Sequence, residues 1–333
     1  MIKITKIKVK VRPVYDISVE DNHNYFANSI NVSNCSEIVL HSSVDYTYTC
    51  VLASMNLVHY REWKGTSAVQ DAIVFLDCVA QEFIERAKNI KGLERAVAFT
   101  KKSRALGLGV CGLHSLFQSE MMAFESLDAH MLNIEIFKHI RSEAEIATKQ
   151  IAEWWGEPDW CKGYNRANSH LLAVAPTKST ALIMGGVSEG INPDTAMVFT
   201  QRSAGGEIDR VNPYLLKLMK KKGVHTNKNV EEIRAAMGSV RNVSWLTDEE
   251  KLVFRTAFEI NQHTIIRMAA ARGKSLDQWQ SLNVFFSAGE DENYINAVHR
   301  ESFLHPDILA LYYVYSMAGI QASQDNNECV ACS

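Results

Sequence analysis

The sequence predicts a mixed α/β protein that begins at Cys35 and is preceded by a short all-β segment, residues 1–34. Two observations predict this division. Near the start of the chain apolar residues alternate with polar ones, which is typical of half-buried strands. After Cys35 the apolar residues recur at helical spacing instead, first over 67–89 and then over 129–154. The bond between Asn34 and Cys35 therefore separates two segments of different architecture.

The composition is that of an ordinary globular protein. The 333 residues carry a formal net charge of −3. Because a nucleic-acid or membrane-surface binder needs a clustered basic excess, we expect neither class of partner. The first residues contain no apolar core of a secretory signal, and no apolar run is long enough to span a membrane. Seven cysteines without an export signal predict a cytoplasmic protein whose thiols serve chemistry instead of a disulfide framework.

Short strands fill the first 34 residues. Residues 2–11 alternate with one slip, which predicts a strand with a bulge that ends at Pro13. A second strand is expected over 14–19, followed by a polar turn. Two further short strands are expected over 25–27 and 30–32, with a turn between them.

Residues 14–34, VYDISVEDNHNYFANSINVSN, resemble the C-terminal end of an intein, and the whole segment 1–34 is similar in length to a naturally split C-terminal fragment. The resemblance implies that a separate N-terminal fragment docks on them to complete an all-β splicing domain of the Hint type. It also implies three chemical roles. Cys35 receives the upstream chain as a thioester, Asn34 cyclises to release residues 1–34, and His23 transfers the proton. The alternative is an ordinary β extension, with His23 in a turn and Asn34 in a loop.

Longer elements are expected after Cys35. A helix is predicted over 67–89 with Thr66 as its cap, and another over 129–154. A capping box at Thr247-Asp248-Glu249-Glu250 starts a helix that is expected to continue through Phe258, Ile265 and Met268. The glycines of 104–118 lack the strand-then-GxGxxG arrangement, which argues against a dinucleotide site.

Cys35-Ser36-Glu37-Ile38 resembles the active-site motif of class I ribonucleotide reductase large subunits, and further motifs follow in the order of that family. The resemblance implies an α/β barrel of which 35–320 form the C-terminal half, and a flexible redox-active tail over 321–333. The further motifs are YTCVLASMNL (48–57), RALGLGVCGL (104–113), FES (124–126), APTKSTALI (175–183), DQWQSLN (277–283), LYY (311–313) and the terminal ECVAC.

By this resemblance Cys35 becomes a thiyl radical that abstracts the 3′-hydrogen of a ribonucleotide. Glu37 takes the 3′-hydroxyl proton, since a spacing of two places both side chains on one face of an extended segment. Cys50 is one of two thiols that reduce the 2′-carbon, and its disulfide partner is a cysteine that this chain does not contain. The alternatives are a solvated carboxylate at Glu37 and a buried apolar thiol at Cys50.

Two further segments have roles implied by the resemblance. Residues 176–180 open a short helix, and their hydroxyls and N–H groups suit a diphosphate; plain helix capping explains the same composition. Tyr312 and Tyr313 form a pair that relays a hydrogen atom toward Cys35, or else two core aromatics in an edge strand. Neighbours in a regular strand face opposite ways, so a stacked pair requires a twist or a strand end there. The expected diphosphate-binding residues are Pro176, Thr177, Lys178, Ser179 and Thr180.

Cys329 and Cys332 form a CxxC motif in the tail. With no second CxxC and no flanking His, a zinc site within the chain is not expected. Thiol exchange is the preferred interpretation: the tail re-reduces the Cys50 disulfide and is reduced in turn by thioredoxin or glutaredoxin.

The sequence is therefore interpreted as a precursor: a split-intein C-terminal fragment joined to half of a ribonucleoside-diphosphate reductase. The expected partners are the other half carrying the intein N-fragment, a radical-generating small subunit with its own metal, and a second large subunit. ATP and dNTP effectors are expected mainly on the other half, and no cofactor is expected on this chain. The alternatives are a split subunit assembled without ligation and a catalytically inactive interaction subunit.

Overall fold

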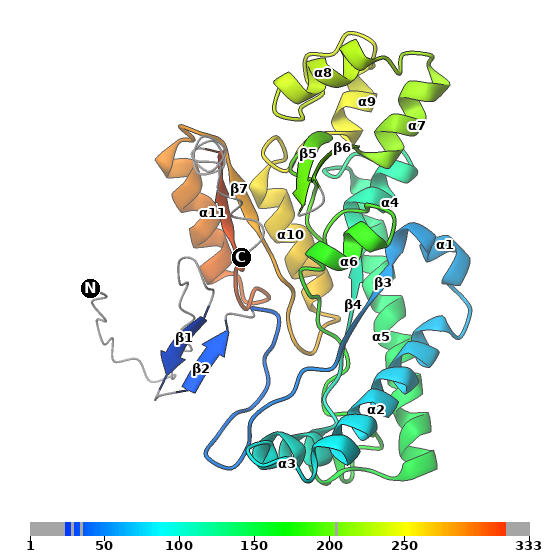
Figure 1. Ribbon diagram of the computed structural model, residues 1–333, viewed down its shortest axis with the longest axis vertical. Coiled ribbons are helices and arrows are strands. Elements are labelled where there is room, and N and C mark those ends of the chain that lie inside the picture. The colour runs from blue at the N-terminus through cyan, green and yellow to red at the C-terminus, as the bar shows by residue number, and fades with distance from the viewer. Residues whose placement is uncertain (1–23, 28–29, 34–35, 204–205, 318–333) are drawn as a thin grey trace.

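The computed structural model describes residues 24–27, 30–33, 36–203 and 206–317 (Figure 1). The strands expected before residue 20 lie outside these ranges, and so do five of the expected site residues. Their roles stay predictions. These residues are His23, Asn34, Cys35, Cys329 and Cys332.

The second half of the all-β segment is a hairpin, as the sequence predicts. Strand β1 (Asn24–Ala27) pairs antiparallel with β2 (Ile30–Ser33), with Asn24 opposite Ser33 and Ala27 opposite Ile30. Its second strand ends one residue before Asn34.

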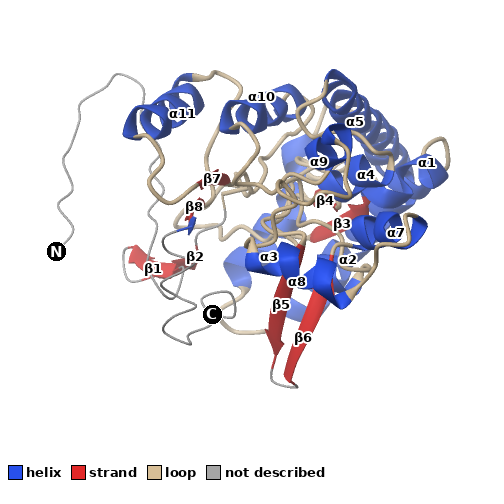
Figure 2. Ribbon diagram, turned by 90° about the horizontal axis from the view of Figure 1, so that it is seen from above, coloured by secondary structure: helices blue, strands red, loops and turns tan. Residues whose placement is uncertain are grey.

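Parallel strands form the centre of the rest of the chain. Strand β3 (Leu52–Asn56) pairs with β4 (Gly107–Cys111), and isolated parallel bridges continue sideways from Leu108 to Leu172 and from Val174 to Gln280. Figure 2 shows β3 and β4 enclosed by helices. A second parallel pair joins β7 (Val284–Phe286) to β8 (Val314–Ser316).

Two glycines of 104–118 lie within this sheet and allow its segments to pack closely. Gly107 and Gly109 lie inside β4 itself, not in a loop after a strand. A Cβ added to Gly109 would lie 2.4 Å from the carbonyl oxygen of Ala173. The neighbouring segment therefore packs so close to the backbone of Gly109 that a side chain would clash with it. This role agrees with the prediction that no dinucleotide loop is present.

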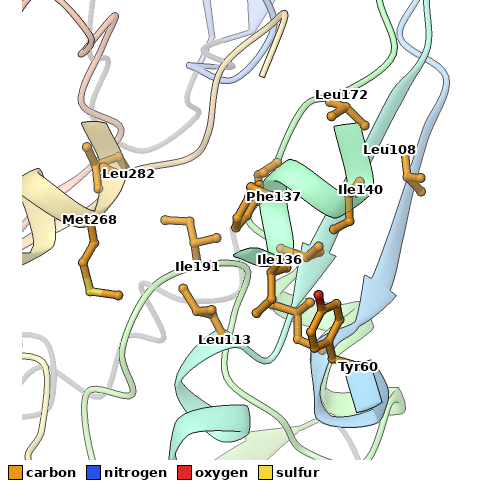
Figure 3. Packing of buried hydrophobic residues seen from close by; sticks show 14 of the residues in the cluster. Tyr60, Leu108, Leu113, Ile136, Phe137, Ile140, Leu172, Ile191, Met268 and Leu282 are labelled. Carbon is orange, nitrogen blue, oxygen red and sulfur yellow. The ribbon is translucent and has the colours of Figure 1, made fainter. Parts of the chain in front are cut away.

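Helices cover the sheet and share its core. The two long helices appear where periodicity predicts them, as α2 and α5, and they pack against each other. Thr66 accepts a hydrogen bond from the N–H of Ala68, although Ser67 is the cap residue. In Figure 3, Ile136, Phe137 and Ile140 of α5 gather near Leu108 and Leu172 of the sheet. The helices of this part are α1 (Tyr60–Trp63), α2 (Ala68–Ala87), α3 (Glu94–Ser103), α4 (Leu113–Ser119), α5 (Leu127–Trp155), α6 (Lys178–Ile183), α10 (Gln262–Gly273) and α11 (Glu292–Leu304).

A smaller apolar cluster lies at the top of Figure 1. It contains Met197, Leu215, Met219, Ile233 and Phe254. It is built from a hairpin and three short helices: β5 (Val198–Ser203), β6 (Gly206–Val211), α7 (Pro213–Lys221), α8 (Asn227–Ala235) and α9 (Asp248–Val253).

The helix predicted to run from the capping box to Met268 is wrong in its length. The capping box between Thr247 and Glu250 is present, but α9 ends at Val253 and α10 begins only at Gln262. Between them the N–H of Ala257 donates to the carbonyl of Asp194, and the Asn261 side chain caps α10. Long-range and capping hydrogen bonds therefore replace the helical ones, while the apolar spacing stays compatible with one helix. Within the described residues, no helix is both long and apolar enough to cross a bilayer.

A buried ion pair ties α2 to the start of β4. The side chain of Asp77 is 0% exposed and receives two hydrogen bonds from the Arg104 guanidinium, at 2.8 and 2.7 Å. The Nδ2 of Asn168 donates a third at 2.8 Å. Removing the cation leaves a buried carboxylate with one neutral donor.

We therefore expect Arg104→Met to lower the free energy of unfolding by about 3 kcal/mol, because a buried charge loses its partner. Arg86→Met is the matched control: Arg86 pairs with Glu82 on the same helix, but the two side chains are 80% and 59% exposed. Its effect is expected to stay below about 1 kcal/mol. Urea unfolding of both variants measures the difference, and equal losses contradict a structural role for the buried pair.

Candidate functional site

Glu37 is a buried carboxylate in a bend, not in the extended segment that the sequence predicts. It is 3% exposed, its carbonyl accepts from the N–H of Trp279 at 2.9 Å, and its Oε2 accepts from the Ser281 hydroxyl at 2.8 Å. Burial raises the pKa of Glu37, while hydrogen bonds from its own backbone and from Ser281 oppose the rise. The alternative of a solvated carboxylate is therefore wrong. A buried carboxyl that accepts a hydrogen bond from a neighbouring hydroxyl can serve as an acceptor or donor of a proton.

A chain of hydrogen bonds connects Glu37 to the tyrosine pair. Ser281, which donates to Glu37, offers its carbonyl to the Nδ2 of Asn192 at 2.9 Å. The Oδ1 of Asn192 accepts from the N–H of Asn283 at 3.0 Å, and the Oδ1 of Asn283 accepts from the N–H of Tyr313 at 3.1 Å. Asn192 is 3% exposed and uses both ends of its amide. The position of the carboxylate is thereby fixed relative to the tyrosine backbone.

Tyr312 and Tyr313 lie just before strand β8, where the sequence argument requires a strand end for two neighbouring rings to face each other. Their ring centroids are 4.0 Å apart, with an angle of 47° between the planes. Tyr315 continues the group, 5.7 Å from Tyr313, and stacks on Phe285 at 5.2 Å. Close aromatic rings at such distances are suited to passing a hydrogen atom or an electron between them.

The segment 176–180 opens helix α6, as predicted, but by an unusual turn. Thr177 has φ +60°, a left-handed conformation that is strained for a β-branched residue. Its hydroxyl makes no cap hydrogen bond and instead accepts from the N–H of Gly190 at 2.8 Å. The Thr177 side chain therefore does not cap α6. The ammonium of Lys178 lies 5.9 Å from the centroid of the Tyr313 ring.

Cys50 is exposed and lies two residues before β3. The alternative of a buried apolar thiol is therefore wrong. The next residue, Val51, accepts a hydrogen bond from the N–H of Gly107 at 2.9 Å, which attaches the segment to β4. An accessible thiol can take part in exchange, whereas Cys111 and Cys161 are buried and burial raises the pKa of each to about 11.

Sequence reasoning missed the residues that connect the site. Ser281 and Asn283 belong to the DQWQSLN motif without a role of their own, and no motif includes Asn192. The neighbouring sequence Gly190-Ile191-Asn192-Pro193 offered a weak signal, since a polar residue stands between an apolar residue and a proline. In the described residues no group of three or more His, Cys, Asp or Glu side chains is arranged to hold a metal ion.

A second polar cluster is centred on Asp194, two residues after Asn192. The Asp194 carboxylate accepts from the Nδ2 of Asn212 at 3.1 Å, and the same Nδ2 donates to Gln118 at 2.8 Å. The N–H of Asp194 donates to the Nδ1 of His114, whose pKa burial lowers to about 3. Burial and the nearby Glu189 charge raise the pKa of Asp194 to about 7, although 21% of its side chain remains exposed. Near pH 7, Asp194 is therefore the group of this cluster that gains or loses a proton, while His114, Gln118 and Asn212 stay neutral.

This predicts a pH-dependent stability. The unfolded chain loses the Asp194 proton near pH 4, while the folded chain keeps it to about pH 7, so stability falls as pH rises between these values. We expect Asp194→Asn to be more stable than the wild type by on the order of 3 kcal/mol at pH 8, and by much less at pH 4. Urea unfolding across this range, with the exposed Asp45→Asn as control, measures the difference. A gap that stays constant with pH contradicts the assignment.

Comparison with known proteins gives one consistent answer. The sequence model of the family described as "Ribonucleotide reductase, barrel domain" matches residues 14–167 and 147–313. The chain is 36% identical to the ribonucleoside-diphosphate reductase large subunit of Invertebrate iridescent virus 3, over 86% of this chain and 46% of that protein. It is 30% identical to the large subunit of Danio rerio, over 89% of this chain and 41% of that protein.

Among solved structures, the class Id ribonucleotide reductase alpha subunit of Actinobacillus ureae matches with a TM-score of 0.80 and 39% identity. The match covers 85% of this chain and 52% of that one. The chain thus spans about half the length of the relatives that it matches.

Proposed function

The chain belongs to the ribonucleotide reductase barrel-domain family, and its fold is of the alpha-subunit barrel type; on that premise we propose that it is half of a cytoplasmic ribonucleoside-diphosphate reductase large subunit. The observation that carries the proposal is the buried Glu37 carboxylate, connected through Ser281, Asn192 and Asn283 to the backbone of Tyr313. A base and a radical relay held at a fixed separation are what the reaction needs.

In the proposed reaction Cys35, directly before the docked Ser36 and Glu37, acts as a thiyl radical. Its sulfur takes the 3′-hydrogen atom of the ribose, and Glu37 takes the proton of the 3′-hydroxyl. The 2′-hydroxyl leaves as water. Cys50 and a cysteine of the other half supply two electrons and two protons and become a disulfide; one of these protons leaves with the 2′-hydroxyl as water. Glu37 then returns its proton to the 3′-oxygen, and the 3′-hydrogen returns from Cys35. The exposed thiol of Cys50 supports this assignment.

We assign the substrate diphosphate to residues 176–180. The left-handed turn at Thr177 leaves the start of α6 without a side-chain cap, and Lys178 provides a positive charge beside it. Free N–H groups with a nearby cation favour an anion. α6 is short, so the lysine supplies the larger part of the attraction.

Tyr312 and Tyr313 are proposed to relay the oxidising equivalent from a radical-generating small subunit. Cys329 and Cys332 are proposed to re-reduce the Cys50 disulfide, with thioredoxin or glutaredoxin as the final reductant. Effector nucleotides and the dimer contact are assigned mainly to the other half of the subunit, which this chain lacks.

We further propose that residues 1–34 are removed by protein trans-splicing, which joins Cys35 to the other half. The hairpin β1–β2 supports this, because it ends at Ser33, directly before the Asn34-Cys35 junction.

A second candidate has its own support. The family match begins at residue 14, inside the segment assigned to the intein. This favours a split subunit in which residues 1–34 remain attached and assemble without ligation. An inactive interaction subunit is the third possibility, and the complete set of Glu37, Cys50 and the tyrosine pair argues against it.

Co-expression with the other half, followed by intact-mass measurement, separates these functions. Trans-splicing predicts one longer chain that has lost the mass of residues 1–34, whereas unligated assembly predicts two chains of unchanged mass in one complex. A reductase assay of the product with the small subunit then tests activity. A complex that binds the small subunit but forms no deoxynucleotide contradicts the enzymatic proposal.

A further inference from the structure

Trp279 connects the segment that carries Glu37 to the segment that leads to the tyrosine pair. Its main-chain N–H donates to the carbonyl of Glu37 at 2.9 Å, and its indole Nε1–H donates to the carbonyl of Ala310 at 2.8 Å. Tyr312 follows Ala310 by two residues, and the N–H of Tyr312 donates to the carbonyl of Leu282 at 2.7 Å. A single residue therefore makes hydrogen bonds to the backbones of both parts of the candidate site.

The indole lies in a slot that the surrounding backbone leaves for it. Trp279 is only 2% exposed. Helix α10 ends at Gly273, where an added Cβ would lie 2.6 and 2.9 Å from two carbons of the indole ring and 3.2 Å from the carbonyl oxygen of Asp307. A side chain at position 273 would therefore displace the ring, the Asp307 backbone or both. The glycine keeps the indole within reach of Ala310.

The segment that receives the indole hydrogen bond has little regular structure of its own. The described residues 305–313 belong to neither a helix nor a strand, and each of them is at least partly exposed. Repeating backbone hydrogen bonds do not hold such a segment along its length, so its position depends on individual contacts. Glu37 and Trp279, at the other end of the connection, are both buried. A buried donor is thus joined by a short hydrogen bond to an irregular, half-exposed segment.

We propose that Trp279 is a positioning residue, whose indole N–H holds the segment of the tyrosine pair at a fixed place relative to Glu37. This deepens the proposed function and rests on it. Trp279 itself transfers neither a proton nor a hydrogen atom. Without the N–H, the ring still fills its slot, but the carbonyl of Ala310 loses its donor and residues 310–313 are free to shift. A misplacement of about 1 Å can cost on the order of 10²-fold in rate.

The test places benzothienylalanine at position 279 of the full chain, because sulfur replaces the indole N–H in this analogue and the ring shape is kept. Benzothienylalanine at position 63 is the matched control, since the indole of Trp63 also donates to a main-chain carbonyl, that of Asn56, at 3.1 Å. Both variants lose one hydrogen bond of the same kind, so a similar loss of stability is expected. 5-Fluorotryptophan at position 279 keeps the N–H and is expected to behave like the wild type.

Two measurements compare these chains. Hydrogen exchange of the chain alone reports on position: we expect the N–H groups of Tyr312 and Tyr313 to exchange faster in the 279 variant and not in the 63 variant. In the assembled reductase, we expect the 279 variant to lower kcat by roughly 10-fold, with little change in the KM for the substrate. The 63 variant is expected to keep the kcat of the wild type.

Gly273→Ala reaches the same contact from the other side. Its Cβ meets the indole ring and moves the N–H away from Ala310, so we expect the same direction of change in amide exchange and in kcat. Combined with benzothienylalanine at position 279, Gly273→Ala is expected to add less than it costs alone, because the hydrogen bond that it weakens is already absent.

An unchanged kcat in the 279 variant overturns the proposal, whether or not amide exchange changes. Equal losses of kcat in the 279 and 63 variants overturn it as well, since the effect then follows stability alone. Failure of the proposed function looks different, because the assembled wild type then makes no deoxynucleotide. In that case unchanged amide exchange at residues 312 and 313 in the 279 variant still overturns the positioning role.

Discussion

Replacing Glu37 by Gln in the assembled reductase is expected to lower the rate of deoxynucleotide formation by about 10²- to 10⁴-fold, the usual contribution of a general base. Gln has nearly the same shape and can still accept from the Ser281 hydroxyl that contacts Oε2 in the wild type. It cannot take a proton from the 3′-hydroxyl. The loss is therefore expected in kcat, with the KM for the substrate little changed.

Glu232→Gln, an exposed carboxylate on α8, is the matched control and keeps full activity. Ser281→Ala separates the base from its support, since it removes the hydroxyl that donates to Glu37 and leaves the carboxylate in place. We expect a smaller loss and a higher apparent pKa in the pH–rate profile, because one hydrogen bond to the charged form is gone. A Glu37→Gln enzyme with the activity of the control contradicts the role of Glu37.

The second large effect concerns the junction. Asn34→Ala removes the carboxamide whose cyclisation releases residues 1–34, so we expect no spliced product. The upstream chain is still able to reach Cys35, and a branched intermediate carrying both chains is expected to accumulate. Intact-mass measurement after co-expression with the other half detects the branched species, and hydroxylamine releases it because thioesters are sensitive to this nucleophile.

Asn31→Ala is the matched control, since Asn31 lies in the same hairpin, opposite Phe26 and away from the junction. It is expected to leave ligation intact. If Asn34→Ala still gives the ligated product, or if neither the wild type nor the variant ever forms one, trans-splicing is the wrong interpretation and the unligated assembly takes its place.

Helices and turns were accessible from sequence because their signals are local. The stripe over 67–89 becomes α2, Ala68–Ala87, and the stripe over 129–154 becomes α5, Leu127–Trp155. The hairpin at 24–33 follows from short alternating strands around a turn. The parallel strands could not be predicted from a local pattern. All five residues of β4 are buried, so apolar and polar residues do not alternate along it.

The candidate site was predictable only where a motif carries it. Glu37, Cys50, Tyr312 and Tyr313 are marked by motifs; in the structure Glu37 is buried and the two tyrosine rings lie 4.0 Å apart, while their roles stay predictions. The residues that connect Glu37 to Tyr313 could not be predicted from the spacing within any motif. Ser281 meets Glu37 across 244 positions of sequence, and no local pattern encodes such a contact.

The claim on which the account depends is that the sulfur of Cys35 serves in chain joining and again in the reduction of ribose. The most direct measurement uses a single gene in which the other half is joined directly to residue 35, so that no splicing is needed, and compares Cys35 with Cys35→Ser in the presence of the small subunit. The account predicts that the Cys35 chain forms deoxynucleotides and that the Ser variant forms none above background, because a hydroxyl does not supply the weak S–H bond. Deoxynucleotide formation by Cys35→Ser at the rate of the Cys35 chain contradicts it.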